Sequence, residues 1–243
     1  MRTNTPVLYV FAISHYCEKA RWALDHFGID YELRYVAPGE HGEIARKLGA
    51  PKSSVPYLSL DGRVIQGSAN IISWAEEKSG STPFSAACGE IERRIDDVAG
   101  VHVRRFYYSE ALVEYPSTVR PIFTRDLSFA KKMKIGLAWG KIRKIMMARM
   151  DLGAQQGEES KAIVDAELAW IDGLLADGRD YLVGDDFSRA DIAVASILSP
   201  LALPPEHPVY NRVNHPPRMA DDITRWEQRP TLQWVRDIYS KHR

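Results

Sequence analysis

The chain has 243 residues, with 32 lysine and arginine residues balanced by 32 aspartate and glutamate residues, and 45% of its residues are apolar. This apolar fraction and zero net charge exclude an intrinsically disordered protein, which needs low hydrophobicity and high net charge. The two cysteines, Cys17 and Cys88, are too few for a disulfide framework or for a zinc site of four thiolates. We expect a packed protein from a reducing compartment, with no metal site.

The first apolar segment, residues 7–13, predicts a strand and not a targeting sequence. It is followed by charged residues and by no small-residue cleavage site. No stretch reaches the roughly 20 apolar residues that are needed to cross a bilayer. We therefore expect a cytoplasmic protein without a transmembrane segment.

The first quarter of the chain predicts a strand, a helix and a second strand. Residues 7–12 are a continuous apolar run rich in β-forming residues, which is typical of a strand buried on both faces. Residues 14–27 carry apolar side chains at helical spacing, and Gly28 supplies a C-terminal stop. Residues 31–35 alternate with period two and predict a second strand, parallel to the first.

The next elements complete a small α/β domain. Residues 38–49 predict a loop with a short helix. The pair Asp61-Gly62 lies between two β-forming runs, 57–60 and 63–65, which is a strong hairpin signal. Ser68 then begins a helical run. The order βαβ followed by ββα is typical of a thioredoxin-like domain.

The second part of the chain predicts helices and no convincing strand. Serine, glycine, threonine and proline accumulate around residues 79–88, which indicates a linker. Beyond it, apolar residues recur at helical spacing around 90–108, 127–150, 159–176, 190–201 and at the C-terminus, with Pro116 and Pro121 breaking the first long stretch. We therefore predict a thioredoxin-like domain over residues 1–80, a linker over 81–89 and an all-helical domain over 90–243.

Five motifs stand in a fixed order along the chain: Ser14-His15-Tyr16-Cys17, Gly28-Ile29-Asp30-Tyr31, Ser53-Ser54-Val55-Pro56-Tyr57-Leu58, Gln66-Gly67-Ser68 and Tyr181-Leu182-Val183-Gly184-Asp185-Asp186-Phe187-Ser188-Arg189-Ala190-Asp191-Ile192. Together they resemble the cytosolic glutathione transferase superfamily, whose members join a thioredoxin-like α/β domain to an all-α domain. The resemblance implies this architecture, glutathione S-transferase activity with glutathione as co-substrate, and a two-fold homodimer.

The last of these motifs has a structural explanation. Ser188 is a natural helix N-cap, and Asp191 follows three residues later, where its carboxylate can return the hydrogen bond. Phe187 and Ile192 occupy the positions of a hydrophobic staple. We therefore expect a structural and not a catalytic role for Asp191.

Ser14 is the candidate catalytic residue. Its position, three residues before Cys17 at a helix start, resembles the serine-type delta and theta classes, which implies that its hydroxyl stabilises the glutathione thiolate. Lowering the thiol pKa by two units needs about 2.7 kcal/mol. One hydrogen bond to a charged group supplies roughly 1.5–3 kcal/mol. The alternative is that Ser14 is only an N-cap. Tyr9, one residue away from the place of the catalytic hydroxyl in tyrosine-type classes, is expected in the core.

Four further residues are implied in holding the glutathione peptide. Val55 and Pro56 would form a cis peptide bond, with the Val55 backbone paired to the cysteinyl backbone of glutathione. Ser68, at a helix start and with Gln66 nearby, would meet the γ-glutamyl carboxylate. The superfamily usually has Gln, Glu or Asp directly before this serine, whereas this chain has Gly67, which puts the γ-glutamyl contact in doubt.

Two basic residues are implied at the other end of glutathione. His41, in Gly39-Glu40-His41, and Lys52 can meet the glycyl carboxylate. For each, the alternative is a solvated loop residue.

The second substrate is expected against the helical domain. Residues 102–149 carry eleven lysine and arginine residues against three acidic residues, with aromatic residues between them. Tyr107, Tyr108 and Trp139 could line a pocket for a small apolar or anionic electrophile. The same segment also fits a membrane-surface or nucleic-acid element, or a solvated basic face. The overall charge balance argues against nucleic acid as a partner.

Two other functions remain open. A thioltransferase would use Cys17, because the first turn of a helix lowers a thiol pKa, although the helical apolar pattern predicts that Cys17 is buried and inert. A non-catalytic binding module is also similar to this superfamily, as in translation elongation factor gamma subunits and a stringent-starvation regulator of RNA polymerase.

Overall fold

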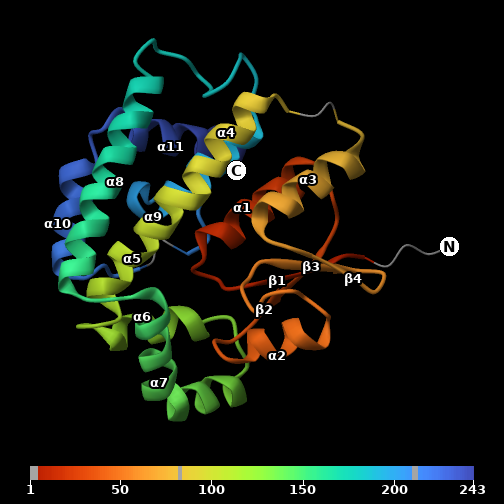
Figure 1. The fold of residues 1–243 in the computed structure, drawn as a ribbon, viewed down its shortest axis with the longest axis vertical. Helices are drawn as coiled ribbons and strands as arrows, with labels where there is room; N and C mark the ends of the chain where they lie inside the picture. Colours follow the sequence, from red (N-terminus) through yellow and green to blue (C-terminus); the bar gives the residue numbers. More distant parts are fainter. Residues whose placement is uncertain (1–4, 82–83, 210–212) are drawn as a thin grey trace. The chain divides into compact units, whose positions relative to one another are not determined.

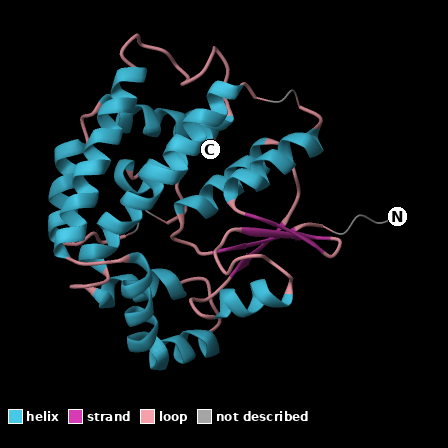
Figure 2. Cartoon of the chain, viewed as in Figure 1, coloured by secondary structure: helices cyan, strands magenta, loops and turns pink. Residues whose placement is uncertain are grey.

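The computed structural model describes residues 5–81, 84–209 and 213–243 (Figures 1 and 2). Their packing divides them into two compact units. Of the described residues, 5–81 and 121–142 form the first unit, and 84–120, 143–209 and 213–243 form the second. All of the described strands belong to the first unit, and the second unit is built from helices (Figure 2). The predicted fold class, an α/β domain followed by an all-helical one, is confirmed.

The first unit contains a four-stranded mixed sheet with the order β2-β1-β3-β4. The strands are β1 (Val7–Val10), β2 (Glu32–Tyr35), β3 (Tyr57–Leu60) and β4 (Arg63–Gln66). β1 pairs with β2 in parallel and with β3 antiparallel, and β3 pairs antiparallel with β4. The β3–β4 turn places Asp61 at φ 47° and Gly62 at φ 76°, the left-handed pair that a tight hairpin requires. The predicted hairpin is confirmed.

Helices cover both faces of this sheet (Figure 1). Side chains alternate along β1, so that Leu8 and Val10 pack on one face with α1 (His15–His26) and α3 (Ser68–Ser79). Tyr9 points to the other face and packs with Ala45 of α2 (Glu40–Lys47). The Tyr9 ring also stacks on Tyr57, with ring centroids 5.0 Å apart. Tyr9 is therefore a core residue, as predicted.

Residues 121–142 pack with the sheet domain. They hold the end of α6 (Pro116–Thr124) and the first part of α7 (Phe129–Met150). Leu127 and Ile135 form a small buried cluster with Ala37, and Lys131 Nζ lies 2.7 Å from a carboxylate oxygen of Glu40. Sequence periodicity identifies the helix but not the surface on which it packs, which is why the limits predicted from sequence assign this segment to the helical domain. Pro121 lies within α6 instead of ending a helix.

The second unit is organised around α9 (Arg189–Ala202), in which every residue from 190 to 202 is buried. It also contains α4 (Ala86–Arg94), the π-helical turn η1 (Ile95–Ala99), α5 (Gly100–Ala111), α8 (Ala154–Leu174), α10 (Pro217–Trp226) and α11 (Pro230–His242), together with the start of α6 and the end of α7. α9 packs against α4 and α11, and α5 packs against α8. Helix α4 begins inside the segment 81–89 that was predicted as a linker, of which residues 82–83 lie outside the described part of the chain.

The start of α9 is held by the buried carboxylate of Asp191, which is 0% exposed. One oxygen accepts hydrogen bonds from the Ser188 backbone N–H at 2.8 Å and from the Ser188 hydroxyl at 2.7 Å. The other oxygen accepts a bond from the Leu182 N–H at 2.8 Å. The predicted hydrogen bonding between Ser188 and Asp191 is confirmed, and the bond from Leu182 also ties the preceding loop to the start of α9.

The Phe187 ring, just before this helix, stacks on the ring of His242 in α11, with ring centroids 4.0 Å apart.

Candidate functional site

The topology of the first unit brings its candidate residues to one edge of the sheet. The register pairs Tyr9 with Tyr57 and Tyr57 with Gln66. Because β3 runs antiparallel to its neighbours, the end of β1, the start of β3 and the end of β4 meet at that edge. Ser14 follows β1, Val55 precedes β3 and Ser68 follows β4. Residues far apart in the sequence thus approach each other at the ends of adjacent strands.

Ser14 is the half-buried N-cap of α1, with φ −83° and ψ 117°. Its Oγ accepts a hydrogen bond from the Cys17 backbone N–H at 3.3 Å. A hydroxyl that accepts this bond keeps its own hydrogen for donation to another group. The N-terminus of a helix also favours a negative charge. Ser14 can therefore cap the helix and donate to an anion at the same time.

Cys17 is buried in the core and is only 1% exposed. It packs in the same cluster as Leu8, Ala20 and Leu24. Burial raises the pKa of the Cys17 thiol to about 12, and the opposing hydrogen bond with Ser14 is too weak to offset this. The thiol is therefore neutral at physiological pH and poorly placed for redox chemistry, as the helical pattern predicts.

The Val55–Pro56 peptide bond is cis, as the resemblance implies. Pro56 is buried, and its carbonyl accepts a bond from the Gly67 N–H at 3.0 Å. Val55 is half-buried, and among the described residues its backbone N–H and C=O have no hydrogen-bonding partner. An unpaired backbone donor and acceptor beside a strand can bind an extended peptide in the manner of an added strand.

Helix α3 begins at Ser68, as predicted, and Gly67 is its N-cap, with φ 90° and ψ 142°. A positive φ of this size favours glycine, which explains why the chain has no Gln, Glu or Asp there. Ser68 is the first residue of the helix and is 4% exposed, and its hydroxyl forms no hydrogen bond within the described part of the chain. An unused hydroxyl at a helix N-terminus suits a carboxylate ligand.

The Gln66 side chain fixes the loop that leads to Val55. Its amide oxygen accepts a bond from the Lys52 N–H at 2.8 Å, and its amide nitrogen donates to the carbonyls of Lys52 and Ser54, each at 2.7 Å. Both amide hydrogens are therefore used within the protein. Gln66 is better described as a positioning residue than as a direct ligand contact, whereas the Lys52 side chain remains exposed.

His41 lies at the same edge, because β2 runs parallel to β1 and leads into α2. Its Nδ1 accepts a hydrogen bond from the Gly39 N–H at 3.1 Å, and its ring packs edge-on against Phe11 at 4.9 Å. The Tyr57 hydroxyl donates to the His41 carbonyl at 3.1 Å. These contacts orient the half-buried imidazole with Nε2 as its second polar atom.

The three residues proposed for the second substrate fall into different units. Tyr107 and Tyr108 lie on α5, where their rings meet edge to face at 5.1 Å. Burial raises the pKa of both phenols, so neither ionises near neutral pH. Trp139 belongs to the first unit, where it packs near Phe123 at 6.4 Å. Neither unit by itself gathers all three residues into one cluster.

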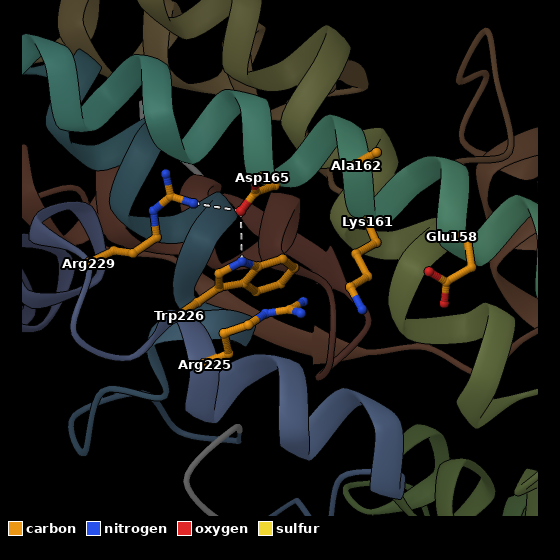
Figure 3. A pocket seen from close by; sticks show the side chains of 7 residues that line it. All are labelled: Glu158, Lys161, Ala162, Asp165, Arg225, Trp226 and Arg229. Carbon is orange, nitrogen blue, oxygen red and sulfur yellow. Dashed lines mark hydrogen bonds and ion pairs between the residues drawn. The ribbon is translucent and has the colours of Figure 1, made fainter.

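A separate groove of about 520 Å³ lies in the helical unit and is lined by residues of α8 and α10 and by Arg229 (Figure 3). Asp165 accepts hydrogen bonds from Trp226 Nε1 at 2.9 Å and from Arg229 Nη1 at 2.6 Å. Lys161 Nζ lies 2.7 Å from Asp222. These ion pairs hold the groove together, and Glu158 adds to its lining a carboxylate that forms no ion pair within the described ranges.

Two absences apply to the described ranges 5–81, 84–209 and 213–243. In them, no three histidine, cysteine, aspartate or glutamate side chains gather in an arrangement that could hold a metal ion. No helix in these ranges is both long enough and apolar enough to cross a membrane.

Comparison with known proteins relates the N-terminal and the C-terminal parts of the chain to the same family. Residues 8–83 match the family model for the glutathione S-transferase N-terminal domain, and residues 154–233 match the one for the glutathione S-transferase C-terminal domain. A search of curated proteins finds no sequence match.

Solved structures share the fold over nearly the whole chain. The β-etherase LigF from Sphingobium sp. strain SYK-6 is 19% identical, with 96% of this chain and 99% of that chain covered and a TM-score of 0.59. Glutathione transferase GSTFuA3 from Phanerochaete chrysosporium is 16% identical, with 99% and 98% covered and a TM-score of 0.64. A glutathione S-transferase of Ceriporiopsis subvermispora, crystallised in complex with glutathione, is 15% identical, with 98% of each chain covered and a TM-score of 0.63.

The two family models match both parts of the architecture, in the order that the superfamily requires. The solved structures extend the likeness in fold across the segment between the two matches. The chain therefore belongs to the glutathione S-transferase superfamily.

Proposed function

We propose that the protein is a serine-type glutathione transferase, in which the Ser14 hydroxyl stabilises the thiolate of bound glutathione for attack on a small electrophile. One observation carries the proposal. A hydroxyl at one helix start, an unpaired backbone donor and acceptor at Val55, and an unused hydroxyl at Ser68 meet at the same edge of the sheet. Together they match the sulfur, the peptide backbone and the γ-glutamyl carboxylate of glutathione.

Each contact has a physical role. The Val55 N–H and C=O would pair with the cysteinyl residue of glutathione, which places the sulfur toward the start of α1 and Ser14. The γ-glutamyl carboxylate would accept hydrogen bonds from Ser68 at the N-terminus of α3. Lys52 would bind the glycyl carboxylate by charge and His41 by donation from Nε2, and Gln66 would hold the 52–54 loop in place.

The proposed reaction requires mainly one hydrogen bond, from the Ser14 hydroxyl to the glutathione sulfur. The bound thiol releases its proton to water, and Ser14 donates its hydroxyl hydrogen to the resulting sulfur anion. The thiolate then forms a carbon–sulfur bond, and the leaving group departs with the electron pair, or the electrophile accepts it in an addition. A hydrogen bond to a charged group supplies roughly 1.5–3 kcal/mol and a helix N-terminus about 0.3–1 kcal/mol. Together these two contributions can reach the roughly 2.7 kcal/mol that is needed to lower the pKa of the glutathione thiol by two units.

The electrophile is proposed as an apolar or anionic small molecule. Burial raises the pKa of the Tyr107 and Tyr108 phenols and makes them weaker proton donors, so they would supply apolar surface and not acid catalysis. Trp139 and the basic residues of 102–149 would add aromatic surface and attraction for an anion. A homodimer follows as a prediction from membership of the superfamily. The thioltransferase alternative is disfavoured by the burial of Cys17.

Glutathione binding tests the proposal. In isothermal titration calorimetry we expect the wild-type protein to bind glutathione and Ser68→Ala to bind it at least about tenfold more weakly, because one hydrogen bond to a carboxylate is lost. Ser73→Ala is the matched control. Ser73 lies on the exposed face of the same helix, and its hydroxyl donates to the Ala69 carbonyl at 3.0 Å.

Two results would count against the proposal. No binding by the wild-type protein at millimolar glutathione would remove the transferase function altogether. Equal affinities for wild type, Ser68→Ala and Ser73→Ala would show that glutathione binds elsewhere than at the start of α3.

A further inference from the structure

Helix α7 carries an exposed apolar stripe along its first half. Phe129, Met133 and Leu137 are 79%, 54% and 88% exposed. They recur every four residues and therefore lie along one side of the helix. Ile135 lies near the opposite side and is buried against the sheet domain. The helix thus buries one apolar side and leaves a second one in water.

The same helix carries only positive charge. Its 22 residues include five lysines, two arginines and no acidic residue. At 100° per residue, Lys132 and Lys141 flank the apolar stripe on its two sides. Both are exposed, and neither forms an ion pair within the described part of the chain. By contrast Lys131, on the packed side, pairs with Glu40 at 2.7 Å. We name Phe129, Met133, Leu137, Lys132 and Lys141 the α7 patch.

We propose that the α7 patch binds the surface of a bilayer that contains anionic lipid, with the helix lying in the plane of the interface. Exposed phenylalanine, methionine and leucine side chains can enter the boundary between headgroups and acyl chains. The flanking lysines can place their hydrocarbon stems along the apolar stripe and their ammonium groups among the lipid phosphates. A bilayer surface of this kind would therefore contact both the apolar side chains and the lysines of the α7 patch.

Two other occupants fit less well. A second copy docked by its own α7 about a two-fold axis would bring two helices of seven positive charges together. A nucleic acid would satisfy the lysines through its phosphates but would leave the apolar stripe at the centre of the patch without a counterpart. The proposal does not depend on the glutathione reaction, because vesicle binding needs neither glutathione nor an electrophile.

Vesicle co-sedimentation of the full-length protein tests this inference. We expect binding to phosphatidylcholine vesicles that contain about 30% phosphatidylserine, little binding to pure phosphatidylcholine, and weaker binding as salt is raised. Combined Lys132→Gln and Lys141→Gln substitutions should lower the partition coefficient about 25-fold, at about fivefold for each lysine. Leu137→Ser should lower it as well. Lys78→Gln, on the exposed surface of α3, is the control and should leave it unchanged.

Folding is checked in parallel. Leu137 is 88% exposed, so Leu137→Ser should keep the thermal unfolding midpoint of the wild type. The inference is overturned if the wild-type protein fails to bind the phosphatidylserine vesicles, or if the α7 variants bind them as well as wild type does. It is also overturned if Leu137→Ser abolishes self-association in sedimentation velocity while no vesicle binding is seen, because a second copy would then be the occupant.

Discussion

Ser14→Ala is expected to lower kcat/KM for glutathione conjugation by about 10- to 150-fold at neutral pH, the equivalent of one hydrogen bond to a charged group. The loss should shrink as the pH rises above about 8.5, where free glutathione ionises without assistance. The measurement is the pH profile of kcat/KM for both proteins with a general electrophile. A role in capping alone would lower stability by about 1 kcal/mol but would leave the profile unchanged.

Two variants sharpen this test. Ser14→Thr keeps a hydroxyl at the start of α1 and should recover part of the activity. Cys17→Ala removes the neighbouring thiol and should keep activity within about twofold of wild type, because Cys17 is buried and un-ionised. Loss of activity in Cys17→Ala with full activity in Ser14→Ala would replace the transferase mechanism with a thioltransferase.

Asp191→Ala is expected to lower the free energy of unfolding by about 3–5 kcal/mol, because three buried donors lose their acceptor together. These donors are the Ser188 N–H, the Ser188 hydroxyl and the Leu182 N–H. For a chain of this size, each kcal/mol corresponds to roughly 2–4 °C in Tm, so the midpoint should fall by about 6–20 °C. Thermal unfolding followed by circular dichroism measures the change.

The matched control is Asp186→Ala, an exposed carboxylate five residues earlier in the same motif, which should change the stability by less than about 0.5 kcal/mol. Asp191→Asn retains one acceptor oxygen and should fall between the two. If Asp191→Ala unfolded within about 1 kcal/mol of wild type, the network around α9 would not be a main source of stability.

The features that sequence analysis predicted correctly are those encoded over short distances. Strand β1 follows from a continuous apolar run, β2 from local alternation, and β3 and β4 from two β-forming runs around the Asp61-Gly62 turn. The partnership of Ser188 and Asp191 spans only three residues. The burial of Cys17 follows from helical spacing in α1. In each case the pattern and the contact lie within one element or one turn, so neighbouring residues are enough to define them.

Long-range packing could not be predicted in the same way. Helical periodicity located α7, but its apolar residues do not indicate that they pack with Ala37 of the sheet domain. Gln66 seemed a ligand contact, yet its amide binds the backbone of Lys52, fourteen residues earlier in the chain. In the sequence, Gly67 stands where the superfamily usually has Gln, Glu or Asp. The φ of 90° at this position favours glycine, which has no side chain. These features depend on contacts or backbone angles that spacing does not encode.

The most direct test of the central claim is the pKa of glutathione bound to the protein. Titrating the pH while following the ultraviolet absorbance of the thiolate reports this value. We predict that it lies about two units below the value near 8.5 of a free thiol, and that Ser14→Ala returns it toward that value. Glutathione that binds with an unshifted pKa, or a shift that Ser14→Ala retains, would contradict the role of Ser14 in activating the thiol.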